Sequence, residues 1–171
     1  MIKLLGAVLI ITGTAAWGAG KALRLKNRVR SLSSLVSSLG MMESELETRM
    51  TPMPELLELL ETEAPYPARR LYTEALGEMK KLGETPFSGI WRQSVLKSPE
   101  LLLTAREESC LAELGFSLGR YDIAQVRAAI GYTIRRFSDF RDDAERERKA
   151  NSRMYAFLGV AAGVFAVVVL I

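Results

Sequence analysis

The chain has 171 residues, no histidine and a single cysteine, so it has room for one domain and lacks the residues for disulfide frameworks, Cys/His zinc sites and imidazole catalysis. Its formal net charge of +3 is uneven, because residues 31–140 carry 12 basic and 16 acidic side chains. This acidic middle argues against nucleic-acid binding, since affinity for phosphate backbones needs clustered Lys and Arg.

The first apolar segment covers residues 4–20 and contains no charge. It is near the lower length limit of a membrane-crossing helix, and it can extend past Lys21, whose long side chain reaches toward the headgroups. We therefore predict a transmembrane helix over residues 1–23. A cleaved signal peptide is the alternative, since small residues at 18–20 resemble a cleavage site, but export would carry the cations that follow across the membrane.

The second apolar segment, residues 154–171, is uncharged and apolar on every helical face. We predict a second transmembrane helix there, with a buried or amphipathic helix as the alternative. Basic residues follow the first span and precede the second, at Lys21, Arg24, Lys26, Arg28, Arg30, Arg146, Arg148, Lys149 and Arg153. By the positive-inside rule, a domain over residues 24–153 lies in the cytoplasm and both termini lie outside.

Between the spans, the sequence predicts a series of helices separated by Pro and Gly. The first helix continues to about residue 50, where prolines end it. We expect its core-facing stripe to consist of Leu25, Val29, Leu32, Val36 and Leu39, flanked by Leu35, Met42 and Leu46. A short leucine-rich helix over residues 54–62 should be well buried. A third helix is predicted over residues 67–82, with Gly83 as its cap.

The fourth predicted helix lies between the prolines at positions 86 and 99. Its apolar side consists of Phe87, Ile90, Trp91 and Val95. The fifth runs from a capping box formed by Thr104 and Glu107 to a glycine stop at Gly119. Cys110 falls within this helix, and we interpret it as a small buried apolar residue.

The sixth helix is predicted to begin at Asp122, which with Gln125 forms a second capping box, and to reach the end of the second span. Its apolar face repeats at Ile123, Val126, Ile130, Ile134, Phe137, Phe140 and Ala144. No segment alternates with a period of two for long enough to predict a strand. The predicted fold is all-α: a six-helix cytoplasmic bundle flanked by N- and C-terminal transmembrane helices.

The sequence offers no catalytic constellation. Its glycines do not have phosphate-loop spacing. The adjacent carboxylates Glu107-Glu108 and Asp142-Asp143 point about 100° apart on a helix and do not converge. We therefore predict a protein that is not an enzyme, has no cofactor and takes no small-molecule substrate.

Two sets of charged residues are candidates for docking a partner. The first is an acidic series on two consecutive predicted helices: Glu43, Glu45, Glu47, Glu55, Glu58, Glu61 and Glu63. Solubility alone explains such a series, and docking of a basic partner is the alternative, because charge complementarity steers and orients association. The second set lies on the polar sides of the sixth helix: Tyr121, Arg127, Arg135 and Arg136. An ordinary solvated surface is the alternative for this set.

The order and spacing of several short motifs carry a family resemblance. These are MIKLLGAVLIITGT followed by NRVRSL, MMESELE followed by TPMPE, then YPARRLY, PFSGIW, LGFSLGRYDIAQV and the ending MYAFLGVAAGVFAVVVLI. Over essentially its full length the chain resembles the stage III sporulation protein AB family of endospore-forming bacteria. Tyr121 is a departure, because a small polar residue is expected before the aspartate.

The resemblance implies a location and a role. Members sit in the mother-cell membrane facing the forespore during engulfment, in the channel or secretion apparatus that links the two cells. Their soluble domain is similar to the cytoplasmic domains of the type II secretion inner-membrane platform protein. The chain is therefore expected to be a platform that docks a cytosolic secretion-type ATPase, stage III sporulation protein AA, and other membrane proteins of the complex. A generic two-span regulatory or ligand-sensing protein is the alternative.

Overall fold

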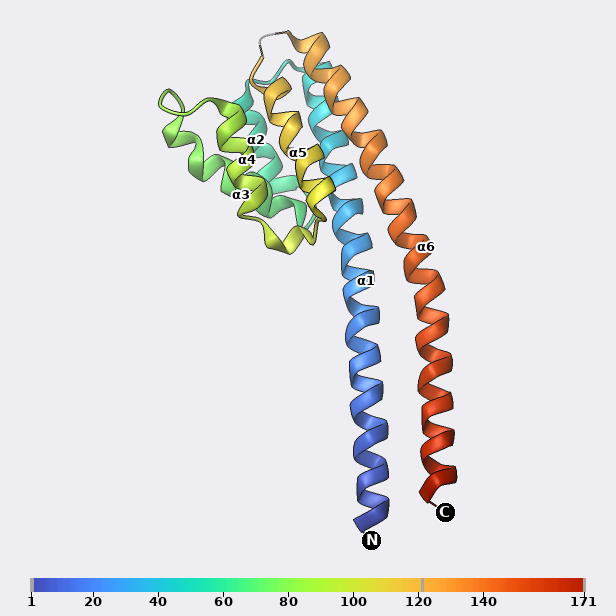
Figure 1. Cartoon of the computed structure of the whole chain (residues 1–171). Coiled ribbons are helices and arrows are strands. Elements are labelled where there is room, and N and C mark those ends of the chain that lie inside the picture. The colour runs from blue at the N-terminus through green and yellow to red at the C-terminus, as the bar shows by residue number, and fades with distance from the viewer. Residues whose placement is uncertain (1, 121, 171) are drawn as a thin grey trace. The chain divides into compact units, whose positions relative to one another are not determined.

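The computed structural model describes the backbone of residues 2–120 and 122–170, and the side chains of residue 20 and of residues 22–120 and 122–151. Within these ranges every regular element is a helix, which confirms the all-α prediction with its six helices. In chain order (Figure 1) they are α1 (Ile2–Thr48), α2 (Met53–Glu63), α3 (Ala68–Glu78), α4 (Phe87–Leu96), α5 (Ala105–Leu118) and α6 (Ile123–Leu170). Single 3-10 turns follow α3 and α4, η1 at Met79–Lys81 and η2 at Pro99–Leu101.

The chain divides into two compact units. One unit is Arg28–Asp142, and the segments of α1 and α6 outside this range form the other. Among the described residues, no helix is both long enough and apolar enough to cross a membrane. The predicted spans, 1–23 and 154–171, fall almost entirely on side chains outside the described residues, so both spans stay predictions.

Helix ends follow local sequence signals in part. The third helix ends at Glu78 rather than at the predicted residue 82, and a 3-10 turn follows it ahead of Gly83. Thr104 Oγ1 accepts a hydrogen bond from Glu107 N at 3.4 Å and Glu107 Oε2 accepts one from Thr104 N at 2.7 Å, which confirms the first capping box. Only one of the two hydrogen bonds of the second capping box forms. Asp122 Oδ1 accepts from Gln125 N at 3.2 Å, but Gln125 Oε1 accepts from Arg120 Nη1 at 3.0 Å instead of reaching back to the helix start.

The buried face of α1 is turned from the centre of the predicted stripe toward its predicted flank, Leu35, Met42 and Leu46. The buried apolar residues of this helix alternate by three and four along the chain: Leu32, Leu35, Leu39, Met42 and Leu46. Val29 and Val36, which the prediction placed at the centre, are half-buried. The buried stripe is rotated around the helix axis relative to the prediction. Serines, and not the valines, lie beside the buried leucines on the side that faces the bundle.

Three buried serines of α1 form this flanking face. Ser31 Oγ donates a hydrogen bond to Leu101 O at 2.5 Å. Ser34 Oγ accepts one from Ala68 N, the first amide of α3, at 3.2 Å. Ser38 Oγ accepts one from the buried Tyr72 hydroxyl at 2.8 Å. The small side chains let α3 approach α1, and their hydroxyls pair polar groups that would otherwise be buried without a partner.

The Ser38–Tyr72 hydrogen bond joins two hydroxyl groups. Removing either hydroxyl should lower the free energy of unfolding, but by unequal amounts. Burial raises the pKa of the Tyr72 hydroxyl, so this group stays neutral and needs a hydrogen-bond partner. Ser38→Ala removes that partner and should cost about 1–3 kcal/mol of unfolding free energy, whereas Tyr72→Phe should cost about 1 kcal/mol. The double variant should be more stable than Ser38→Ala alone. Denaturant unfolding of the full chain measures all three, and equal costs for the two single variants would contradict the assignment.

Trp91 of α4 fixes the packing of α3, α4 and α5. The indole is fully buried, with ring centroids 6.1 Å from Tyr72 and 6.3 Å from Phe87. Its Nε1 donates a hydrogen bond to Leu111 O on α5 at 2.7 Å. Gly115 lies directly against the ring, since a Cβ at this position would be 2.8 Å from Trp91 Cδ1. The missing side chain therefore allows α4 and α5 to pack closely.

The N-terminal part of α6 packs largely as predicted. Val126, Ile130 and Phe137 of the expected stripe are buried, and Ile123 at the helix start is exposed. Gly131 brings this helix close to α1, because a Cβ there would lie 3.1 Å from Glu43 Oε1.

Candidate functional site

The structure separates the acidic residues of α1 from those of α2. Glu47 Oε1 forms an ion pair with Arg127 Nη2 of α6 at 2.7 Å. Glu45 pairs with Arg49 on its own helix at 3.7 Å and accepts a hydrogen bond from Thr51. Glu43 is half-buried beside α6. These carboxylates therefore contact other parts of the chain, and the structure does not combine them with α2 into one free surface.

The carboxylates of α2 have a different environment. Glu55 and Glu58 are exposed and Glu61 is half-buried, whereas the leucines on the opposite side, Leu56, Leu57 and Leu60, are buried. No ion pair within the described ranges involves these three glutamates. Successive residues are three apart, so they lie along one side of the helix. We call Glu55, Glu58 and Glu61 the acidic face of α2, and it carries unneutralised negative charge.

The predicted basic set of α6 is not brought to one site. Arg127 faces α1 through its ion pair with Glu47. Arg136 lies over the rings of Phe140 and Tyr132, at 5.5 and 5.8 Å from the ring centroids, and its Nη1 donates a hydrogen bond to Tyr132 Oη at 3.0 Å. Arg135 is exposed. Tyr121, the remaining member, lies outside the described residues.

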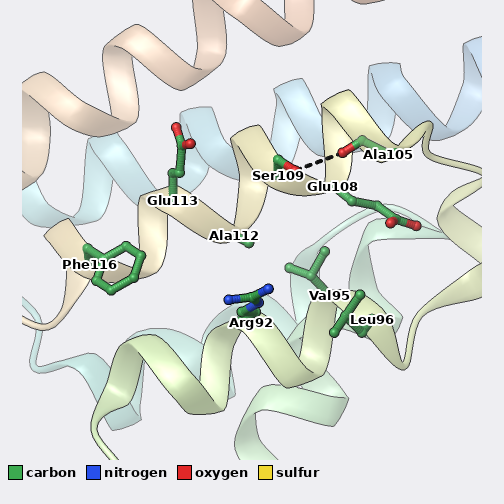
Figure 2. Close-up of a pocket in the computed structure, with 9 residues that line it drawn as sticks. All are labelled: Arg92, Val95, Leu96, Ala105, Glu108, Ser109, Ala112, Glu113 and Phe116. Atoms are coloured by element: carbon green, nitrogen blue, oxygen red, sulfur yellow. Dashed lines mark hydrogen bonds between the residues drawn. The ribbon is translucent and has the colours of Figure 1, made fainter.

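A second surface, between α4 and α5, is absent from the sequence-based prediction. It is a groove of about 450 Å³ lined by Arg92, Val95, Leu96, Ala105, Glu108, Ser109, Ala112, Glu113 and Phe116. Figure 2 shows Phe116 and Leu96 at opposite ends of the groove, with Arg92 between them. We call this surface the α4–α5 groove. The sequence signal for it is weak: Leu96 and Phe116 are apolar residues that lie off the buried faces of their helices.

A smaller hollow of about 300 Å³ lies between α5 and α6, and it contains Cys110 beside Arg106, Glu113 and Arg136. Burial is the main cause that raises the pKa of the Cys110 thiol, so the thiol is a poor nucleophile. The prediction that Cys110 is buried is confirmed only in part, because this residue is half-buried. Among the side chains that the structure describes, no three potential ligands gather to hold a metal ion.

Comparison with known proteins identifies the family. The family model of stage III sporulation protein AB matches residues 3–171 of this chain. The chain belongs to this family. A relative within it, stage III sporulation protein AB of Bacillus subtilis (strain 168), is 27% identical over 171 residues, with 99% of each chain covered. This result confirms the resemblance found in the sequence motifs.

The fold is also shared with a solved member of the family. A structure of stage III sporulation protein AB matches with a TM-score of 0.64 and 22% sequence identity, and the match covers 72% of this chain and 98% of that chain. The stage III sporulation protein AB family is defined by its place in sporulation and not by a known enzymatic activity.

Proposed function

We propose that this protein is a non-enzymatic membrane platform of the mother-cell-to-forespore channel apparatus required for endospore formation. In this proposal the helical domain lies in the mother-cell cytoplasm, the predicted spans hold it in the membrane facing the forespore, and both termini lie outside. The domain docks the cytosolic ATPase, stage III sporulation protein AA, and the spans contact other membrane proteins of the complex. Membership of the sporulation family supports the setting.

The observation that carries the docking proposal is the acidic face of α2. Glu55 and Glu58 are exposed, and the described ion pairs leave all three carboxylates of this face without a cation. By contrast, Glu45 and Glu47 of α1, from the same acidic series, form ion pairs with Arg49 and Arg127. A free acidic surface on one short helix favours a partner with a basic surface, because complementary charge accelerates encounter and fixes orientation.

The alternative of a small-ligand sensor has less support. A ligand site is expected to enclose most of a small molecule in an apolar cavity with converging polar groups. In the α4–α5 groove, the two largest apolar side chains, Leu96 and Phe116, are 61% and 62% exposed. A surface of this kind suits a macromolecular partner better than a small molecule.

Charge reversal of the acidic face tests the docking proposal. The triple variant Glu55→Lys, Glu58→Lys and Glu61→Lys should bind the purified ATPase about tenfold or more weakly at low salt. The unaltered chain should lose affinity as salt rises, because screening acts on exposed charges. Titration of the ATPase against the full chain in detergent measures both effects.

A matched variant distinguishes an effect of the acidic face of α2 from an effect of the net charge of the whole chain. Glu84, Asp139 and Glu147 are exposed and lie outside α2. Their reversal to lysine changes the net charge by the same amount and should leave ATPase affinity within about twofold. Equal affinities of the two triple variants at low salt would rule out the acidic face of α2 as the docking surface.

A further inference from the structure

The α4–α5 groove is long enough to accommodate several turns of a helix. Along α5 its wall is built from small residues on one face, Ala105, Ser109 and Ala112, and Phe116 closes the row. From Ala105 to Phe116 the helix rises about 16 Å, or three turns. Leu96 and Phe116, at the two ends, are 61% and 62% exposed. Large apolar side chains exposed at both ends of a hollow are typical of surfaces that bind another protein.

Arg92 determines which chemistry the occupant must bring. Its side chain is exposed and lies between the apolar ends of the groove (Figure 2). It takes part in none of the ion pairs formed among the described residues. An apolar partner that covered Arg92 would remove from water a charge that neither Glu108 nor Glu113 pairs with in the described ion pairs, and this would weaken binding. The occupant therefore needs a carboxylate between its apolar contacts.

We propose that the α4–α5 groove binds an amphipathic helix of a partner protein. This helix places bulky apolar residues against Leu96 and Phe116 and a carboxylate against Arg92. Glu108 and Glu113 on α5 favour basic residues along the neighbouring edge of the same helix. A second copy of this chain that paired groove to groove would be a poorer match, because two identical concave surfaces leave each other unfilled. The proposal is independent of ATPase docking, since the groove shares no residue with the acidic face of α2.

Two synthetic helical peptides serve as probes. Both carry leucines at the two ends of one face and lysines along one edge, and they differ only in a glutamate or a lysine between the leucines. The full chain in detergent should bind the glutamate peptide about tenfold more tightly than the lysine peptide. Arg92→Glu should reverse this preference. Fluorescence anisotropy of labelled peptides measures the affinities.

Variants of the groove ends supply the second arm of the test. Leu96→Ser and Phe116→Ser should each weaken binding of the glutamate peptide by about tenfold. Leu82→Ser is the control, because Leu82 is 51% exposed and lies outside the groove. All three replaced side chains are exposed, so the folded state should persist, which thermal unfolding checks. ATPase affinity, measured on the same samples, should not change.

Three results would overturn the proposal. The first is a peptide preference that Arg92→Glu leaves in place, and the second is unchanged peptide binding by the groove variants. The third is self-association of the chain that Leu96→Ser and Phe116→Ser abolish and the glutamate peptide does not compete with, which would make a second copy the occupant. Failure of the acidic-face test alone would leave the groove proposal intact.

Discussion

Replacing Glu107 by alanine should lower the free energy of unfolding by about 2–3 kcal/mol. The Glu107 carboxylate is 3% exposed and pairs with Arg28 through Oε1–Nη2 at 2.6 Å and Oε2–Nη1 at 3.1 Å. Oε2 also accepts the hydrogen bond from Thr104 N that starts α5. The substitution would leave the Arg28 guanidinium, 22% exposed, without a carboxylate and would remove half of the helix cap. Partial exposure of Arg28 keeps the cost below that of a fully buried pair.

Three further variants identify why Glu107→Ala lowers the free energy of unfolding. Each is measured by denaturant unfolding of the full chain. Glu107→Gln keeps an oxygen for Thr104 N and should recover about 1 kcal/mol. The double variant Arg28→Leu with Glu107→Leu should be more stable than Glu107→Ala, because no charge is left without its partner. Glu108→Ala, at the neighbouring half-buried position, should cost less than about 0.5 kcal/mol. A double variant that is no more stable than Glu107→Ala would contradict the coupling between Arg28 and Glu107.

Glycine-to-alanine substitutions at two helical positions should have opposite signs. At Gly115 the new Cβ would lie 2.8 Å from Trp91 Cδ1, and the indole is held by its bond to Leu111 O, so overpacking should cost about 1–3 kcal/mol. At Gly40, in the interior of α1, an added Cβ meets no atom within 4 Å. Gly40→Ala should therefore stabilise the protein by about 0.5–1 kcal/mol, because alanine is the better helix former.

The same indole provides the control for this comparison. In a Trp91→Leu background the ring is gone, so adding Gly115→Ala should no longer carry the overpacking cost. Thermal unfolding of the four variants is sufficient, because the expected differences shift the melting temperature by several degrees. Equal melting temperatures for Gly115→Ala and Gly40→Ala would show that the indole moves aside.

The parts of the fold that sequence predicted well depend on local signals. The Thr104–Glu107 capping box is a contact over three residues, and prolines mark where helices cannot continue. The serine face of α1 was missed because a hydrophobic pattern counts serine as polar, whereas Ser34 and Ser38 are buried by partners 34 residues away. Packing of α3 against α1 buries these serines, and tertiary hydrogen bonds satisfy their hydroxyls. No local pattern contains either effect.

The docking surfaces also depend on tertiary contacts that local sequence patterns do not contain. The acidic residues were grouped by nearness in sequence, but the fold turns Glu47 toward Arg127, which comes from the last helix. Only the part of the series on α2 remains a free surface. The α4–α5 groove joins Leu96 and Phe116 from two helices, and each looks like an ordinary apolar residue until the helices are packed.

The hydrogen bond from Ala68 N to Ser34 Oγ has a consequence for local opening. First-turn amides of a helix normally exchange with solvent quickly, because no carbonyl of their own helix pairs with them. The Ala68 amide is instead held by a side chain of another helix, inside the bundle. Its exchange with deuterium therefore requires α1 and α3 to separate. One amide at the start of a short helix thus reports the integrity of the contact between two helices.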